Sequence, residues 1–111
     1  MGLKFLGSLL ITPLTPQALD SVAAIAAAGK GKPFNAIVIQ QRRGNAGFVF
    51  VGDSAMTGEA TLSYIIPPAS ATTAPFLEIE YGGGGSNPVG IEGIKVDGSA
   101  GETVQVYGKE A

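Results

Sequence analysis

The chain has 111 residues, a length typical of a single domain, and it contains neither histidine nor cysteine. Serine–histidine triads, cysteine nucleophiles, zinc sites and disulfide scaffolds are therefore excluded. Charged residues make up only 14% of the chain, against about 25% in an average soluble domain. We expect a binding or structural protein, with no catalytic residue, no metal site and no cofactor.

The low charge also bears on the partners of this protein. Because its net charge is only −2, the surface is weakly protected against association, which favours burial in an assembly over a free monomer. An acidic balance argues against nucleic acid as a partner, since nucleic acid requires a concentrated basic surface. No stretch approaches the ~20 apolar residues of a membrane span, so we expect no membrane partner either.

Residues 1–15 are interpreted as an N-terminal arm or a first strand. The apolar run from Leu3 to Ile11 ends at Thr12-Pro13, well before any residues that could form a signal-peptide cleavage site. A strand or arm that packs on a neighbouring subunit is therefore favoured over a leader peptide. The prolines that follow keep the chain extended.

Residues 16–32 predict one short helix or a linker. Between residues 17 and 28 the chain is rich in alanine, and larger apolar residues recur at helical spacing. Thr15 followed by Pro16 is typical of a helix N-terminus, and Gly29 is typical of its end.

The rest of the chain, residues 33–111, changes to short strands bounded by glycine and proline. The strands are expected at 34–41, 48–51, 61–66, 76–81, 93–97 and 103–107. Their number and spacing predict a mainly β domain, an antiparallel β-sandwich that is jelly-roll-like, with an extended N-terminal arm and at most one short helix.

The turn residues predict how these strands connect. The cluster at 42–47 indicates a hairpin between strands 34–41 and 48–51, with Arg42 and Arg43 at its tip. The cluster at 98–101 indicates a second hairpin between strands 93–97 and 103–107. In the strand at 76–81 alternation places Leu77, Ile79 and Tyr81 on a core face and the two glutamates on the opposite face.

Short motifs that suggest chemistry are better explained as turns or solvated surface. Gly52-Asp53-Ser54 resembles the nucleophile block of one serine esterase family, but that chemistry requires a histidine base. The glycines at 82–85 precede a proline and a strand instead of the helix that a phosphate-binding loop requires. Glu78 and Glu80 are interpreted as a solvated strand face, and Asp97-Gly98-Ser99 as a turn.

The order of the later segments resembles a group of small tailed-phage virion proteins. Their shared pattern has a block like Asn-x-Gly-x-Val-Tyr-Val-Gly-Asp-Ser, matched here by Asn45-Ala46-Gly47-Phe48-Val49-Phe50-Val51-Gly52-Asp53-Ser54. A late segment like Ile-Tyr-Val-Asp-Gly-x-x-Gly-Glu-x-Val is matched by Ile94-Lys95-Val96-Asp97-Gly98-Ser99-Ala100-Gly101-Glu102-Thr103-Val104. The resemblance covers residues 34–107 and implies a β-sandwich with a role in the virion.

The resemblance implies a non-enzymatic structural protein, for which a capsid decoration (cement) protein is our leading interpretation. Such a protein would be made in the host cytoplasm, form a homotrimer and bind the major capsid protein on the capsid surface, stabilising the shell. The expected contacts are Leu3, Phe5, Leu9 and Ile11 of the arm and Arg42 and Arg43 of the turn. The alternatives are a tail, baseplate or head-fibre component and a small carbohydrate-binding module, which the absence of tryptophan disfavours.

Overall fold

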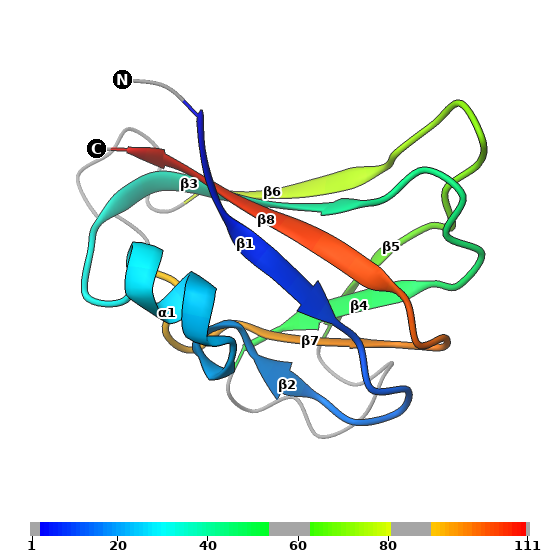
Figure 1. The fold of residues 1–111 in the computed structure, drawn as a ribbon, viewed down its shortest axis with the longest axis horizontal. Coiled ribbons are helices and arrows are strands. Elements are labelled where there is room, and N and C mark those ends of the chain that lie inside the picture. Colours follow the sequence, from blue (N-terminus) through cyan, green and yellow to red (C-terminus); the bar gives the residue numbers. More distant parts are fainter. Residues whose placement is uncertain (1–2, 54–62, 81–89, 111) are drawn as a thin grey trace.

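Two four-stranded antiparallel sheets face each other in the computed structural model, which describes residues 3–53, 63–80 and 90–110 (Figure 1). Sheet A has the order β1 (Leu3–Leu10), β8 (Thr103–Glu110), β3 (Phe34–Gln41), β6 (Phe76–Glu80). Sheet B has the order β2 (Gln17–Ala18), β7 (Lys95–Gly98), β4 (Val49–Gly52), β5 (Ser63–Ile66). The antiparallel β-sandwich expected from the sequence is confirmed.

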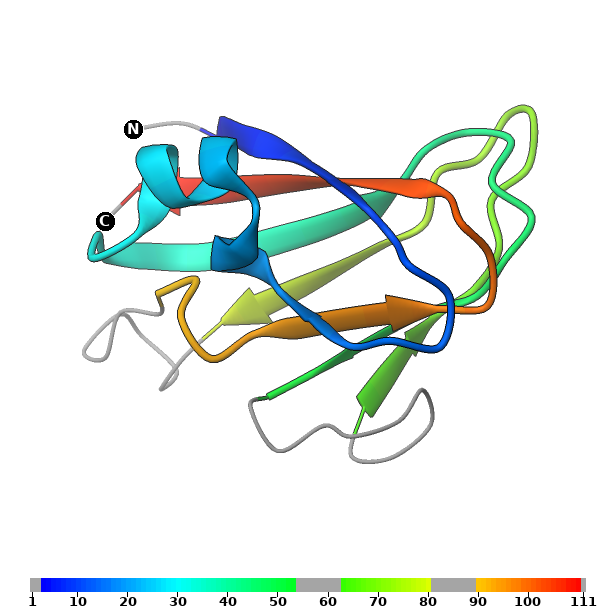
Figure 2. The same cartoon turned by 60° about the horizontal axis from the view of Figure 1, so that its bottom comes forward.

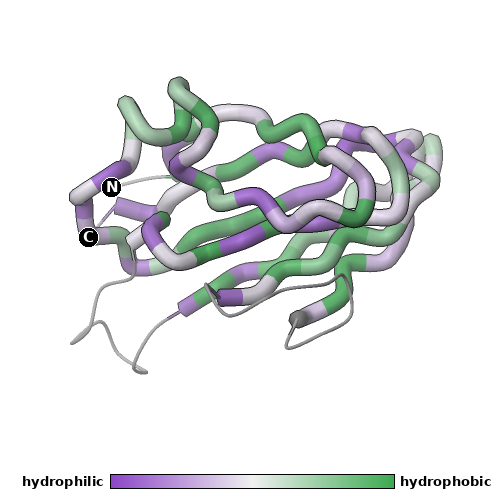
Figure 3. Tube along the Cα trace, turned by 90° about the horizontal axis from the view of Figure 1, so that it is seen from below, coloured by the Kyte–Doolittle hydropathy of each residue, from purple (hydrophilic) through white to green (hydrophobic). Residues whose placement is uncertain are grey.

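The core lies between the two sheets because their strands alternate between apolar and polar residues. Figure 3 shows this alternation as a change of colour along the strands of both layers. The side chains that meet between the layers are nearly all β-branched or leucine, and the larger ones are Leu9, Ile37, Ile39, Val49, Val51, Ile66, Val96, Val104 and Val106. In β6, Leu77 and Ile79 pack against this core, as the alternation predicted.

Residues Leu3–Leu10 form a strand of sheet A, so the first-strand interpretation replaces the free arm. β1 pairs with β8 along its whole length, from Leu3 opposite Lys109 to Leu10 opposite Thr103. A β-bulge shifts the register between Phe5 and Gly7. Since β1 and β2 both precede residue 33 and each belongs to a sheet, the sandwich is not confined to residues 33–111.

The helix is shorter than the sequence pattern predicted. It begins at Ala23 and ends at Gly29 (α1), with Val22 and not Thr15 as its N-cap residue. Residues 17 and 18 are taken by β2, which pairs with β7, and the Leu19 amide then donates to the Ile94 carbonyl at 3.0 Å. Strand pairing thus removes the first turn of the predicted helix, and Leu19–Ser21 form a 3₁₀ turn instead.

Helix α1 closes one end of the sandwich. A Cβ atom added at Gly29 would lie 3.4 Å from both Leu6 and Phe34, two residues of the core. Close packing also explains Gly7 in β1, because a Cβ atom there would lie 2.7 Å from Cγ1 of Ile25. The helix therefore covers the end of the core and leaves the outer side of sheet A uncovered (Figure 1).

Both predicted hairpins are wrong, because each pair of strands is divided between the two sheets. β3 lies in sheet A and pairs with β6 and β8, whereas β4 lies in sheet B and pairs with β5 and β7. Likewise β7 lies in sheet B and β8 in sheet A. Figure 2 shows these connections passing from one layer to the other at the end of the sandwich that is far from the chain termini. Residues 42–48 and 99–102 are thus crossovers between sheets.

The two crossovers are joined by hydrogen bonds to a single carboxylate. Glu102 accepts from the amides of Ala46 at 2.9 Å and Gly47 at 2.8 Å, one on each carboxylate oxygen. Next to it, the buried side-chain amide of Asn45 donates to the Thr103 carbonyl at 2.8 Å and to Oε1 of Gln41 at 2.9 Å. These bonds hold the chain where it leaves one sheet for the other, and they give partners to the buried side chains of Gln41 and Asn45.

Glu102→Gln is expected to destabilise the protein by about 0.5–1.5 kcal/mol, since an amide side chain has one acceptor oxygen and one of the two backbone amides loses its partner. The free energy of unfolding in urea measures this loss. Glu80→Gln, at an exposed position of β6, is the control and is expected to change it by less than about 0.5 kcal/mol. Equal effects of the two substitutions would contradict the role assigned to Glu102.

Leu9→Ala and Leu10→Ala form a matched pair that tests whether β1 is part of the core. Leu9 is 0% exposed and Leu10 is 64% exposed, although they are neighbours in one strand. We expect Leu9→Ala to cost about 2–5 kcal/mol of unfolding free energy and Leu10→Ala less than about 0.5 kcal/mol. If β1 were a detachable arm, neither substitution would lower the stability of the remaining domain.

Candidate functional site

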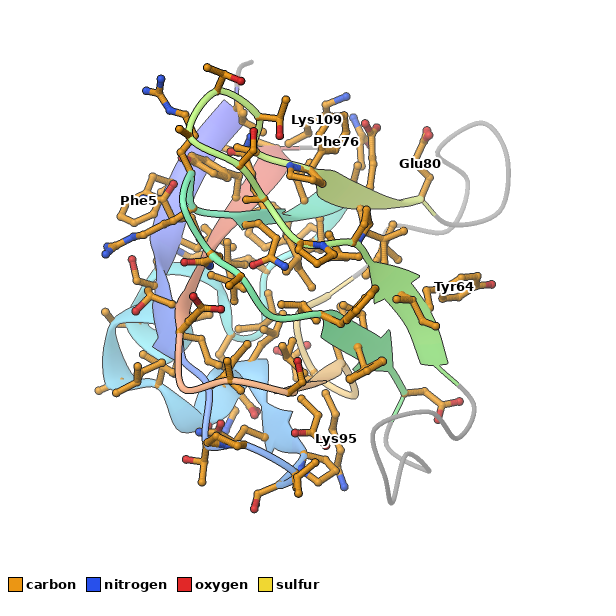
Figure 4. The ribbon with its side chains drawn as sticks, turned by 90° about the vertical axis from the view of Figure 1, so that its right-hand side faces the viewer. Phe5, Tyr64, Phe76, Glu80, Lys95 and Lys109 are labelled. Atoms are coloured by element: carbon orange, nitrogen blue, oxygen red, sulfur yellow. The ribbon has the colours of Figure 1, made fainter. Side chains whose placement is uncertain are left out.

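The candidate site is the outer side of sheet A, which we call the open face. Its residues come from all four strands of the sheet. Besides the polar Gln105 and Glu80 they include Leu3, Phe5, Leu10, Tyr107, Lys109, Val38, Gln40, Phe76 and Glu78. Four of them are large apolar side chains that are more than half exposed: Leu3, Phe5, Leu10 and Phe76. Figure 4 shows Phe5, Phe76 and Lys109 projecting from the strands of this sheet.

The strand register brings these residues into rows across the sheet. Val38 of β3 lies opposite Glu78 of β6 on one side and opposite Tyr107 of β8 on the other. Tyr107 in turn lies opposite Phe5 of β1. Directly opposed residues on one face of a sheet contact each other, so each row is a continuous strip of side chains.

A shallow hollow of about 350 Å³ lies within the open face. It is lined by Leu3, Val38, Gln40, Phe76, Glu78, Tyr107 and Lys109. At its border the rings of Phe5 and Tyr107 pack with centroids 5.3 Å apart and an interplanar angle of 57°, a tilted arrangement that is favourable for aromatic pairs.

The polar groups around the hollow are bonded to one another or to the backbone. Lys109 Nζ donates to Oε2 of Glu78 at 3.0 Å, and the Tyr107 hydroxyl donates to Oε1 of Gln105 at 3.2 Å. The Gln40 side-chain amide donates to the Ala74 carbonyl at 3.1 Å. The two charges at the hollow therefore neutralise each other, and much of its wall is apolar. Such a surface suits an apolar partner better than a charged one.

The expected contact residues of the first strand are divided between two environments. Leu3 and Phe5 are exposed on the open face, but Leu9 and Ile11 are buried in the core and are unavailable to a partner of the folded chain. The bulge between Phe5 and Gly7 explains the difference. A regular strand would turn all four odd-numbered side chains to one face, and the extra residue in the bulge reverses the alternation after Phe5.

Arg42 and Arg43 are exposed but do not join the open face. They lie in the crossover between β3 and β4, at the end of the sandwich opposite Leu3, and not at a hairpin tip. The Arg42 carbonyl accepts from the Asn45 amide at 3.2 Å, so this segment is a turn held by its own backbone. The structure thus offers no common surface for all six expected contact residues.

The other sequence motifs occupy separate places in the described part of the chain. Glu78 is paired with Lys109, and Asp97 is a buried residue of β7, not part of a turn, with Oδ1 accepting from the Gly98 amide at 2.7 Å. Ser54, Tyr81 and the glycine run at 82–85 lie outside the described residues. Among residues 3–53, 63–80 and 90–110, no group of three acidic side chains is placed to hold a metal ion. Within the same ranges no helix has the length and apolarity needed to cross a membrane.

Three side chains at the centre of the site, those of Phe76, Tyr107 and Val38, were not among the expected contacts. A signal for Phe76 was present, because it shares the alternation of Glu78 and Glu80, which were assigned to the outer face. Tyr107 carries the same kind of signal, because it shares the alternation of Thr103 and Gln105 against Val104 and Val106. For Val38 the local pattern carries no such signal, since a continuous apolar run is typical of a central strand.

No protein-family model matches this chain. No curated protein sequence is significantly similar to it.

The open face is expected to bind a fluorescent dye that reports exposed apolar surface, such as ANS. Phe5→Ser and Phe76→Ser each remove an aromatic side chain that is more than half exposed, so each should lower the dye fluorescence of the folded protein. Tyr64→Ser, which removes an aromatic side chain that is 70% exposed on β5 of sheet B, is the matched control. Equal loss in all three variants would show that the open face is not a distinct apolar surface.

Proposed function

We propose that this chain is a non-enzymatic structural protein of a tailed-phage virion, a capsid decoration protein that binds the outer capsid surface and copies of itself. The observation that carries the proposal is the open face, an apolar surface built on a rigid sheet. In this role the protein is made in the host cytoplasm, forms a homotrimer and stabilises the shell to which it binds.

The strand pairing supports this kind of protein. Strands pair in nested order, β1 with β8, β2 with β7, β3 with β6 and β4 with β5. We infer that this nesting is the strand order of a jelly roll, an architecture that viral capsid domains use, although lectin domains use it as well. Architecture does not determine function, so the nested strand order supports the proposal by analogy. The main support is the exposed apolar surface of the open face.

The open face has the properties of a surface that is covered in an assembly. Scattered exposed apolar residues are ordinary, but an apolar patch rimmed by polar residues is typical of an interaction site. Burial of a few hundred Å² of such surface contributes several kcal/mol at about 25 cal/mol per Å², before ordering costs. Repetition over a symmetric shell multiplies such contacts through avidity.

Attachment through the open face differs physically from attachment through a free arm. Leu3 and Phe5 are already fixed on a paired strand, so binding orders little additional backbone. The contact surface proposed here is therefore Leu3, Phe5 and their neighbours on sheet A, without Leu9 and Ile11.

A carbohydrate-binding role is less well supported by the same surface. Aromatic side chains are present, but the polar side chains beside them already bond to one another or to the backbone. The chain also contains no tryptophan, and among the described residues only Phe5 and Phe76 are aromatic side chains of this face that are more than half exposed. Binding to a glycan array that is lost on Phe76→Ser would favour this role over the structural one.

Co-sedimentation of the purified protein with isolated heads and with isolated tails of the parent virion tests the proposal. We expect saturable binding to heads, at least about tenfold weaker for Phe5→Ser and unchanged for Tyr64→Ser, because only Phe5 lies on the open face. Binding to tails alone would assign the chain to the tail, baseplate or fibre. Binding to neither particle would overturn a virion role.

A further inference from the structure

The turn between β1 and β2 presents an exposed leucine in an unusual backbone conformation. The Thr15 amide donates to the Thr12 carbonyl at 3.1 Å, which closes a β-turn with Pro13 and Leu14 at its two central positions. Leu14 has a φ of 62° and is 67% exposed. A positive φ at the third residue of such a turn favours glycine or asparagine, because a larger side chain is strained there.

The strained leucine is held firmly in place. Its amide donates to the Gly98 carbonyl of β7 at 3.1 Å, and the Thr12 amide donates to Oε1 of Gln17 at 2.8 Å. A leucine at this position gains nothing from burial in its own chain. A backbone outlier of this kind, held by the surrounding structure, is a reason to look for a function of the side chain it presents.

We propose that Leu14 of one copy inserts into the hollow of the open face of the next copy. This inference rests on the proposed function of the open face as a docking surface. It names a second copy of the chain as the partner of the hollow and leaves Phe5 and Leu10, which do not line the hollow, to the capsid. The β1–β2 turn lies on the sheet B side of the molecule, whereas the hollow lies on the outer side of sheet A (Figure 2). A chain therefore cannot fill its own hollow.

The two surfaces match in chemistry. The hollow has apolar walls and its one ion pair, Lys109 with Glu78, is internally balanced. The turn at residues 12–16, Thr-Pro-Leu-Thr-Pro, contains no charged residue. Contact between them would bury no unpaired charge, which is the most costly defect of an interface. The two prolines and the fixed turn also lower the ordering cost of binding.

The arrangement determines the symmetry of the assembly. Because the turn and the hollow are different surfaces, the contact is head-to-tail, and such contacts close into rings or continue as filaments. A ring of three copies is the homotrimer expected from the sequence resemblance. In a ring every turn and every hollow is occupied, so no strained leucine remains exposed.

Two variants each remove one half of the contact. Leu14→Gly removes the inserted side chain and also removes the strain of a leucine at positive φ. The free energy of unfolding of this variant should therefore equal or exceed that of the wild type. Phe76→Lys places an unpaired charge in the wall of the hollow at an exposed position of β6. Tyr64→Lys introduces the same charge at an exposed aromatic position of β5, outside both surfaces, and is the matched control.

Sedimentation velocity over a range of protein concentrations measures the result. The wild type and Tyr64→Lys are expected to self-associate, and Leu14→Gly and Phe76→Lys each to associate at least about tenfold more weakly. A mixture of Leu14→Gly with Phe76→Lys should form a dimer and nothing larger, because it contains one intact turn and one intact hollow that can meet. That complementation distinguishes a head-to-tail contact from a symmetric one.

A wild type that stays monomeric at every concentration would overturn the inference, as would self-association that Leu14→Gly leaves unchanged. Pelleting of the same variants with isolated heads keeps the two proposals separate. If self-association fails while binding to heads still depends on Phe5, the open face docks on the capsid and the second copy is not its partner. If self-association is observed but binding to heads is not, the contact between copies stands and the virion role fails.

Discussion

The sandwich depends on how its two sheets are connected, and Glu102 carries much of that connection. Its carboxylate joins the crossover at 42–48 to the crossover at 99–102, which are far apart in the sequence. Without such bonds the same turn residues favour local hairpins, which would place consecutive strands side by side in one sheet. With them, β3 and β4 lie in opposite sheets, and so do β7 and β8.

That pairing also explains why an apolar face remains open. Helix α1 covers one end of the core, beside Leu6 and Phe34, and none of the described elements lies over the outer side of sheet A. The central strands β3 and β8 therefore present Val38 and Tyr107 outward, at positions where a covering layer would otherwise lie. An apolar patch rimmed by polar residues on the outer side of a sheet is typical of a surface that a partner covers, which is the physical basis for assigning this surface to an assembly.

The strained turn at Leu14 and the open face have one property in common. Both carry a cost in the isolated chain, one in backbone conformation and the other in exposed apolar surface. Features that lower the stability of a monomer are retained where they contribute to function, and a contact between copies would recover both costs at once. The low charge of the chain is consistent with this view, since charge repulsion would oppose close association.

The sequence by itself determined the class of fold and the place of every described strand except β2, whose two residues fall in the predicted helix. The strand at residues 34–41 and the two faces of β6 followed from local alternation, because side chains in a strand point alternately to its two sides. Only the tertiary structure decided which strands pair, since glycine-rich turns serve hairpins and crossovers alike and the choice rests on bonds such as those of Glu102. It also decided which side chains of the first strand are exposed and which are buried. One bulge after Phe5 places Leu3 and Phe5 on the open face and Leu9 and Ile11 in the core, and a bulge is a property of strand pairing that alternation along one strand does not contain.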